Sequence, residues 1–68
     1  MRFVLSYENR QGVLMRVLGE VVRRGIVFKR VQASSAIIKL TIDCTPVQAL
    51  QLLRAWRGII DVISAEKI

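Results

Sequence analysis

The chain has 68 residues, a formal net charge of +6 and one cysteine. This length suits one domain, residues 1–68. A domain of this size buries only about 60% of the surface that its unfolded chain exposes, so its stability as a single copy is marginal. A single cysteine excludes an internal disulfide framework and predicts a reducing, cytoplasmic location. No apolar run could span a bilayer, so we expect no membrane association. The apolar fraction of 53% exceeds the usual range, which predicts a homodimer that covers the excess.

The first strand and helix are predicted by their apolar patterns. Residues 2–7 alternate as a half-buried strand requires, and a helix over 10–24 follows. The inward residues of the strand are Phe3, Leu5 and Tyr7. The apolar residues of the helix recur at a 3.6-residue period and are Val13, Leu14, Val17, Leu18, Val21 and Val22. Gly25 is the natural residue for a left-handed cap after this helix.

A hairpin is predicted next. The second strand, 26–33, changes the parity of its apolar residues midway, which predicts a β-bulge near Lys29 and Arg30. The polar pair at 34–35 predicts a short turn, so the third strand, 36–43, should pair with the second. The inward residues of the third strand are expected to be Ala36, Ile38, Leu40 and Ile42.

The last two elements are a helix and a strand. Thr45 followed by Pro46 predicts a helix start, and the helix should cover 46–57. Its core-facing stripe is expected to be Ala49, Leu50, Leu53 and Trp56. At this spacing a tryptophan belongs in the core rather than at a ligand site. The final strand, 59–66, should contact the core through Ile60, Val62 and Ala65.

The element order is βαββαβ, which predicts a ferredoxin-like α+β fold. Right-handed crossovers place both helices on one face of a four-stranded antiparallel sheet. The opposite face should carry a mixed set of side chains, namely Arg2, Val4, Ser6, Ile37, Lys39, Thr41 and Asp43. The second strand at a sheet edge, or the first helix, is the expected surface for a second copy.

Residues that carry chemistry are few. There is no histidine, and the five carboxylates form no evident acid–base pair. Gly12 stands alone before its helix, so no phosphate-binding glycine loop is present, and no metal-ligand cluster is evident. We therefore expect no enzyme activity, no metal and no cofactor. RNA-binding domains of this fold stack bases on outward aromatic residues, whereas the matching positions here are Ile37, Lys39 and Thr41, so RNA binding is the least favoured alternative.

The loop before the first helix is the candidate binding site. Asn9 can cap the first free N–H groups of that helix, and Gly12 lets the backbone approach a ligand closely. A helix N-terminus with exposed N–H groups suits a carboxylate. The alternative, which stays open at this point, is an ordinary strand-to-helix turn that binds nothing.

Nearly the whole chain resembles an ACT domain. The segments that carry the resemblance are Y-E-N-R-Q-G-V-L at 7–14, R-R-G-I at 23–26 and I-I-D-V-I-S-A at 59–65. Within that family the chain is most similar to the small regulatory subunits of acetolactate synthase, in the short form that lacks a C-terminal domain. The resemblance implies a non-catalytic module that dimerises, binds a small, valine-like branched-chain amino acid at the interface, and regulates a thiamine-diphosphate-dependent catalytic large subunit.

The resemblance also implies which residues bind the amino acid. They are Asn9, Arg10, Gln11, Gly12, Val13 and Leu14 before and at the start of the first helix, together with Val27. Two positions depart from the family pattern. Gln11 stands where many ACT domains have proline, and Val27 stands where many have an asparagine that helps to hold the ligand. The second departure keeps an alternative open, namely a structural dimerisation or activation module without ligand.

Overall fold

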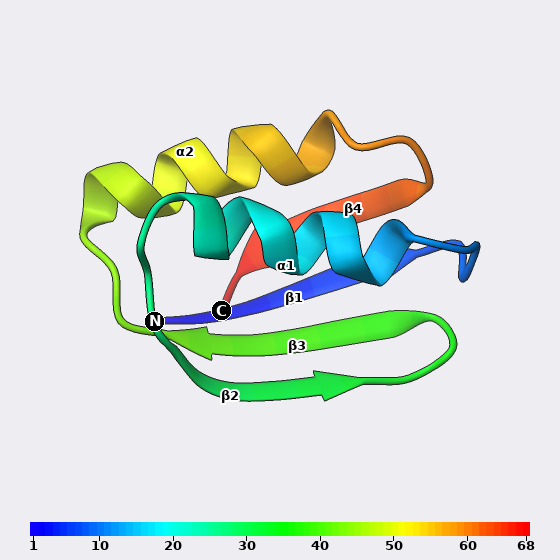
Figure 1. Ribbon diagram of the computed structural model, residues 1–68, viewed down its shortest axis with the longest axis horizontal. Coiled ribbons are helices and arrows are strands. Elements are labelled where there is room, and N and C mark those ends of the chain that lie inside the picture. The colour runs from blue at the N-terminus through cyan, green and yellow to red at the C-terminus, as the bar shows by residue number, and fades with distance from the viewer.

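The computed structural model describes residues 1–68 as four strands and two helices. The strands are β1 (Arg2–Tyr7), β2 (Phe28–Ala33), β3 (Ile37–Ile42) and β4 (Val62–Lys67), and the helices are α1 (Val13–Arg23) and α2 (Pro46–Arg57). The antiparallel sheet has the strand order β2-β3-β1-β4. Both helices lie on one face of it, and the two chain ends lie close together (Figure 1). The predicted ferredoxin-like βαββαβ fold is thus confirmed.

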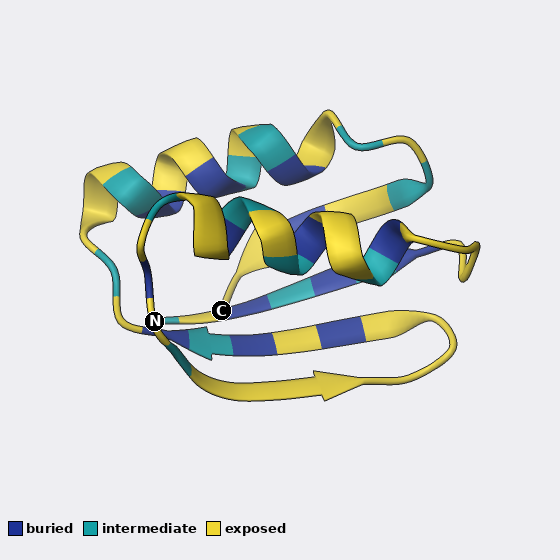
Figure 2. Ribbon diagram, viewed as in Figure 1, coloured by how far each residue is buried: buried dark blue, intermediate teal, exposed yellow.

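The core lies between the sheet and the helices and contains fourteen buried residues. Along β1 and β3 buried residues alternate with more exposed ones, as the sequence pattern predicts (Figure 2). Trp56 is fully buried, and its indole N–H donates to the carbonyl oxygen of Val17 at 3.0 Å. Its ring meets Phe3 edge-on, with centroids 5.2 Å apart. Trp56 is therefore a core residue that ties α2 to α1 and β1.

The hairpin of β2 and β3 forms with the predicted bulge. The register of the two strands shifts between Phe28 and Arg30, so the apolar residues on both sides of the shift point toward the helices. Ser34 closes the turn, since its N–H donates to the Ile37 carbonyl at 2.8 Å and its hydroxyl accepts from the Ile37 N–H at 3.1 Å. Five of the six residues of β2 are nonetheless exposed (Figure 2). This edge strand is the least covered element of the sheet.

Both helices depart from the predicted apolar stripes. Helix α1 begins at Val13 rather than at residue 10, and Val22 is 63% exposed. Helix α2 has the predicted bounds, but Leu50 is 69% exposed while Leu52 is fully buried. Apolar residues surround α2 on all sides, so their spacing does not determine which of them faces the sheet.

The third and fourth strands are shorter than predicted at their starts. Ala36 is exposed and precedes β3, so it is not an inward residue. Strand β4 begins at Val62 because the preceding residues form a turn, in which Asp61 has a φ of 76° and the Val62 N–H donates to the Ile59 carbonyl at 3.2 Å. Ile60, expected in the core, is 76% exposed. Ala65 is buried as predicted, and Val62 is half-buried.

Candidate functional site

The loop from Glu8 to Gly12 is held by its own backbone and by a neighbouring loop. The Arg10 N–H donates to the Glu8 carbonyl at 2.8 Å, and the Val13 N–H donates to the Arg10 carbonyl at 3.2 Å. The Glu8 N–H donates to the Asp61 carbonyl at 2.8 Å. The loop is therefore a tight turn that rests on the connection between α2 and β4.

The N-terminus of α1 is left open by this turn. Gly12 occupies the N-cap position with a φ of 86°, and no side chain caps the helix. The expectation that Asn9 caps α1 is wrong, because the tight turn at Glu8–Arg10 sets Asn9 back from the helix start. Helix α2 differs, since Thr45 and Gln48 close its N-terminus with a complete capping box.

Several backbone donors consequently have no partner within the chain. The Val13 N–H donates to the Arg10 carbonyl. Four other backbone N–H groups make no hydrogen bond within the chain, namely those of Gln11, Gly12, Leu14 and Met15. Met15 was not among the predicted site residues, although its position in the first helical turn is the signal that could have identified it. These donors sit at the positive end of the α1 dipole, where an anion is stabilised.

One cation lies beside these donors. The Arg10 guanidinium has its Nε 3.7 Å from Asp61 Oδ1, and the Arg10 side chain is 72% exposed. The Asp61 side chain is 21% exposed, but an ion pair with one partner as exposed as Arg10 is held only weakly. Arg10 therefore remains free to meet a carboxylate that approaches the loop.

Gly12 is required by the backbone and not by crowding. A Cβ at this position would meet no atom within 4 Å, but the positive φ is one that L side chains rarely adopt. Asn and Asp tolerate this conformation better than other residues. Gly12→Asn and Gly12→Asp should therefore impose nearly the same backbone strain, so that the two variants differ mainly in charge.

The structure brings most of the predicted site residues together, but not all. Asn9, Arg10, Gln11 and Gly12 form one exposed loop, and Leu14 is half-buried beside it. Val13 is 1% exposed, so its side chain belongs to the core. Val27 is 71% exposed and lies between the end of α1 and the start of β2. That helix has 11 residues, or about 16 Å of length, so Val27 cannot contact the loop of its own chain.

No hollow of the single chain lies at this loop. The largest has a volume of about 510 Å³ and lies between the helices, where Arg24, Val47, Leu50, Gln51, Arg54 and Ala55 line it. The loop in one chain is thus an open surface, and an amino-acid pocket there needs walls from elsewhere. No three side chains of His, Cys, Asp or Glu gather as metal ligands.

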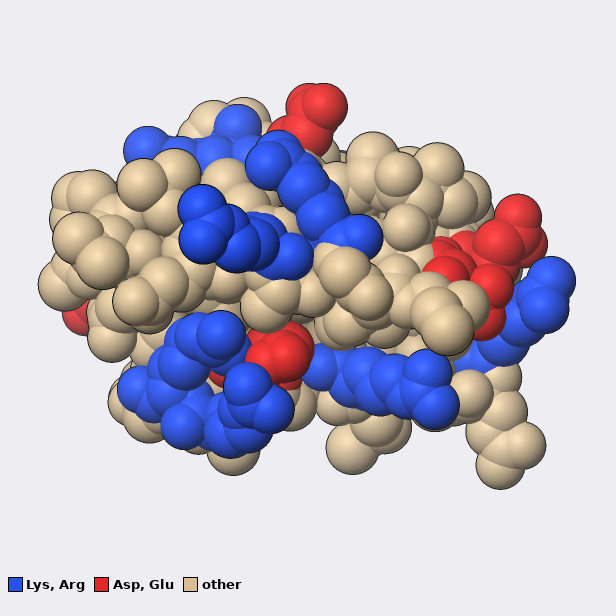
Figure 3. All heavy atoms as spheres, turned by 90° about the horizontal axis from the view of Figure 1, so that it is seen from above, with Lys and Arg blue, Asp and Glu red and all other residues tan.

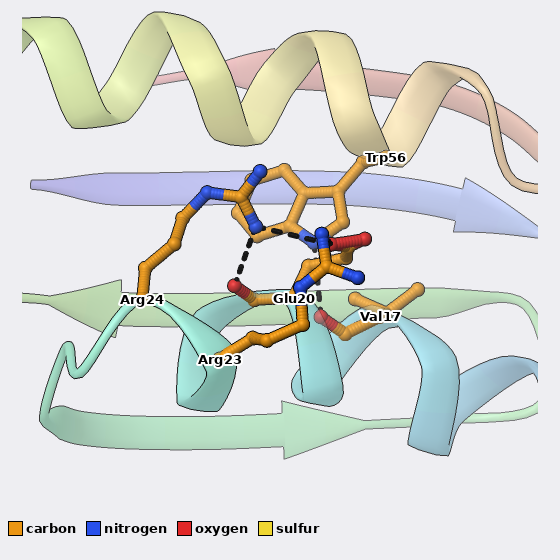
Figure 4. A network of polar contacts seen from close by, with 5 residues as sticks. All are labelled: Val17, Glu20, Arg23, Arg24 and Trp56. Atoms are coloured by element: carbon orange, nitrogen blue, oxygen red, sulfur yellow. Dashed lines mark hydrogen bonds and ion pairs between the residues drawn. The ribbon is translucent and has the colours of Figure 1, made fainter.

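A polar network at the far end of α1 has a structural role. Glu20 Oε1 lies 3.0 Å from Arg24 and 3.3 Å from Arg23, next to the hydrogen bond between Trp56 and Val17 (Figure 4). The remaining basic side chains are dispersed among uncharged residues when the molecule is seen from above (Figure 3). On this side there is no single basic patch.

The only cysteine lies away from the loop. Cys44 is half-buried, and its Sγ lies 3.6 Å from Met1 Sδ. Burial raises the pKa of the Cys44 thiol above its ordinary value. The thiol therefore stays protonated at neutral pH, which suits a small packing residue rather than a nucleophile.

Comparison of the chain with protein-family models gives no match, and comparison with curated proteins gives none. Neither helix combines the length and apolar character needed to cross a membrane.

Proposed function

We propose that this chain is a non-catalytic regulatory ACT domain that pairs with a second copy and binds a small branched-chain amino acid between the two. The proposed setting is the small subunit of a cytoplasmic acetolactate synthase, bound to its thiamine-diphosphate-dependent large subunit. The observation that carries the proposal is the uncapped N-terminus of α1, where Gly12 replaces a capping side chain and four backbone donors have no partner. The resemblance of 7–14 to the ligand loop of ACT domains supports the same surface.

The polar end of an amino acid fits the groups at this loop. Its carboxylate would accept hydrogen bonds from the free N–H groups of Gly12 and the first turn of α1, at the positive end of the helix dipole. The Arg10 guanidinium adds a charge of the right sign. The Asn9 side chain is exposed and makes no hydrogen bond within the chain, so its amide is free to orient the ligand's polar atoms.

A second copy would supply the missing wall. A two-fold axis perpendicular to α1 would reverse the direction of this helix in the partner, so the loop at the start of one α1 would lie opposite the residues that follow the other α1. Val27 is one of those residues and is exposed, so it would meet an aliphatic ligand side chain from across the interface. The exposed edge strand β2 offers unpaired backbone groups for that pairing, and the exposed Val22 on α1 offers apolar surface.

Calorimetry with valine, leucine and isoleucine tests the ligand claim. Gly12→Asp places a negative charge where the carboxylate would sit, so binding should be lost. Gly12→Asn has nearly the same size and tolerance of a positive φ, and should retain more of the binding than Gly12→Asp. Circular dichroism serves as the folding control. Heat that survives Gly12→Asp would place the ligand elsewhere.

The assembly has its own test. Light scattering at micromolar concentration should give twice the chain mass of 7.7 kDa, and a clean monomer would contradict the shared site. Recombinant acetolactate synthase large subunit should be retained on the immobilised chain. A dimer that retains the large subunit but gives no heat with any of the three amino acids would leave a structural activation module, the function that Val27 in place of asparagine favours.

A further inference from the structure

The face of the sheet that is turned away from the helices carries three exposed cations on three neighbouring strands, Arg2 on β1, Arg30 on β2 and Lys39 on β3. The three ion pairs of the chain involve other cations, namely Arg10, Arg23 and Arg24. No carboxylate within the chain therefore neutralises the charge on this face at close range.

The strand register gathers the three cations around one point. Arg2 and Arg30 are both direct cross-strand partners of Thr41 in β3, one from each side. Lys39 precedes Thr41 by two residues and so points to the same face. Directly opposed residues have their Cβ atoms about 5 Å apart, so a single small anion can reach all three long side chains.

A hollow lies at this point. Its volume is about 250 Å³, and its polar lining consists of the three cations together with Gln32 and Thr41. The rest of the lining is apolar and comprises Phe3 and Leu40, which are buried, and the exposed Ile68. The lining thus offers hydrogen-bond donors of two kinds, charged groups and neutral ones. The volume is below that of pockets for drug-sized ligands, which start at about 300 Å³, and suits a compact polar group.

The residues around the hollow define the charge and shape of the ligand. Phe3, Tyr7 and Trp56 are buried, and Phe28 pairs with the buried Ile42 on the helix side of the sheet. This face therefore has no aromatic platform on which a base could stack. Three carboxylates lie nearby, and none forms an ion pair. They are Glu66, opposite Val4 on β4, Asp43, just beyond β3, and the terminal carboxylate of Ile68, a residue that lines the hollow.

We propose that this face is a binding site for a phosphate-bearing small molecule, with Arg2, Arg30 and Lys39 as its charged ligands and Thr41 and Gln32 as its neutral donors. Arginine is suited to this role because its planar fork binds phosphate oxygens in pairs. A diphosphate group matches three cations in charge and the hollow in size. The site lies on the opposite side of the sheet from the helices, so it is separate from the amino-acid site proposed above.

Titration of the isotopically labelled protein with sodium pyrophosphate, followed by two-dimensional NMR in about 150 mM NaCl, tests the site. Amide shifts should centre on Arg2, Arg30, Lys39 and Thr41. Arg30→Gln should weaken binding about tenfold or more, since it removes a charge-assisted pair of hydrogen bonds, and Lys39→Gln should also weaken it. Arg54→Gln, which removes the same charge from an exposed position on α2, is the matched control and should leave the affinity within about twofold.

Three results would overturn the proposal. Shifts spread over the whole surface, or none at all, would show that no site exists. Equal weakening by Arg30→Gln and Arg54→Gln would reduce the effect to net charge. A short RNA oligonucleotide that shifts the same residues at much lower concentration than pyrophosphate would make the face a nucleic-acid surface instead.

Discussion

Two valines on α1 allow a matched test of how this helix packs. Val17 is fully buried, whereas Val22 is 63% exposed. Replacement of Val17 by alanine removes two methyl groups from the core, worth about 1.6 kcal/mol by transfer, and leaves a small cavity that adds to the loss. Alanine returns about 0.5 kcal/mol through its higher helix propensity. We therefore expect Val17→Ala to lower the free energy of unfolding by about 2 kcal/mol, and Val22→Ala to change it by less than about 0.5 kcal/mol.

Urea denaturation followed by circular dichroism measures both losses, and melts at two protein concentrations separate folding from association. Equal losses for the two variants at every concentration would refute the packing of α1 described above. A loss for Val22→Ala that shrinks on dilution would instead place Val22 between two copies, because the stability that pairing adds is lost as the chains dissociate.

Three further predictions concern other parts of the chain. Trp56→Phe removes the N–H that donates to Val17 and should lower the free energy of unfolding by about 1–3 kcal/mol in urea melts; an unchanged value would mean that this bond contributes nothing. Thr45→Ala breaks the capping box with Gln48 and should cost about 1 kcal/mol in the same assay, whereas no loss would show α2 to be stabilised by packing alone. Burial raises the pKa of the Cys44 thiol in the folded chain. The contribution of this group to the free energy of unfolding is therefore complete below the thiol pKa of the unfolded chain and is lost as the pH rises through the pKa of the folded chain. Mass spectrometry should show slower alkylation of Cys44 in the folded chain than in urea, and equal rates would contradict the shift.

The features that were predictable from the sequence depend on local chemistry. Thr45 and Pro46 set the start of α2 correctly, because capping depends on residues adjacent in the chain. The bulge in β2 was predictable from a change of parity, and the register shift between Phe28 and Arg30 confirms it. Gly25 has the expected positive φ, 70°, after α1.

The features that were not predictable depend on contacts between distant residues. Leu50 and Leu52 are chemically alike, and only the position of the sheet buries one and exposes the other. Ile60 is apolar but exposed, because the backbone turns at Asp61. In the candidate site, the exposed loop and Gly12 were predictable from the sequence. Only the folded structure shows that the Val13 N–H donates to the Arg10 carbonyl, and that the length of α1 separates Val27 from the loop.

The two edges of the sheet differ in what they can accept. On β4, the Arg57 side chain donates from Nε and Nη2 to the Ala65 carbonyl, at 3.2 and 2.8 Å, so one acceptor of that strand is already occupied from within. No side chain hydrogen-bonds to the backbone of the edge strand β2, and the side-chain bonds of Ser34 lie in the turn that follows it. A sheet that can grow at both edges propagates into fibres, whereas one that can grow at a single edge stops after one symmetric addition. A single arginine at the end of α2 thereby makes β4 the less receptive edge, so that pairing through β2 would end in a closed pair rather than an open-ended polymer.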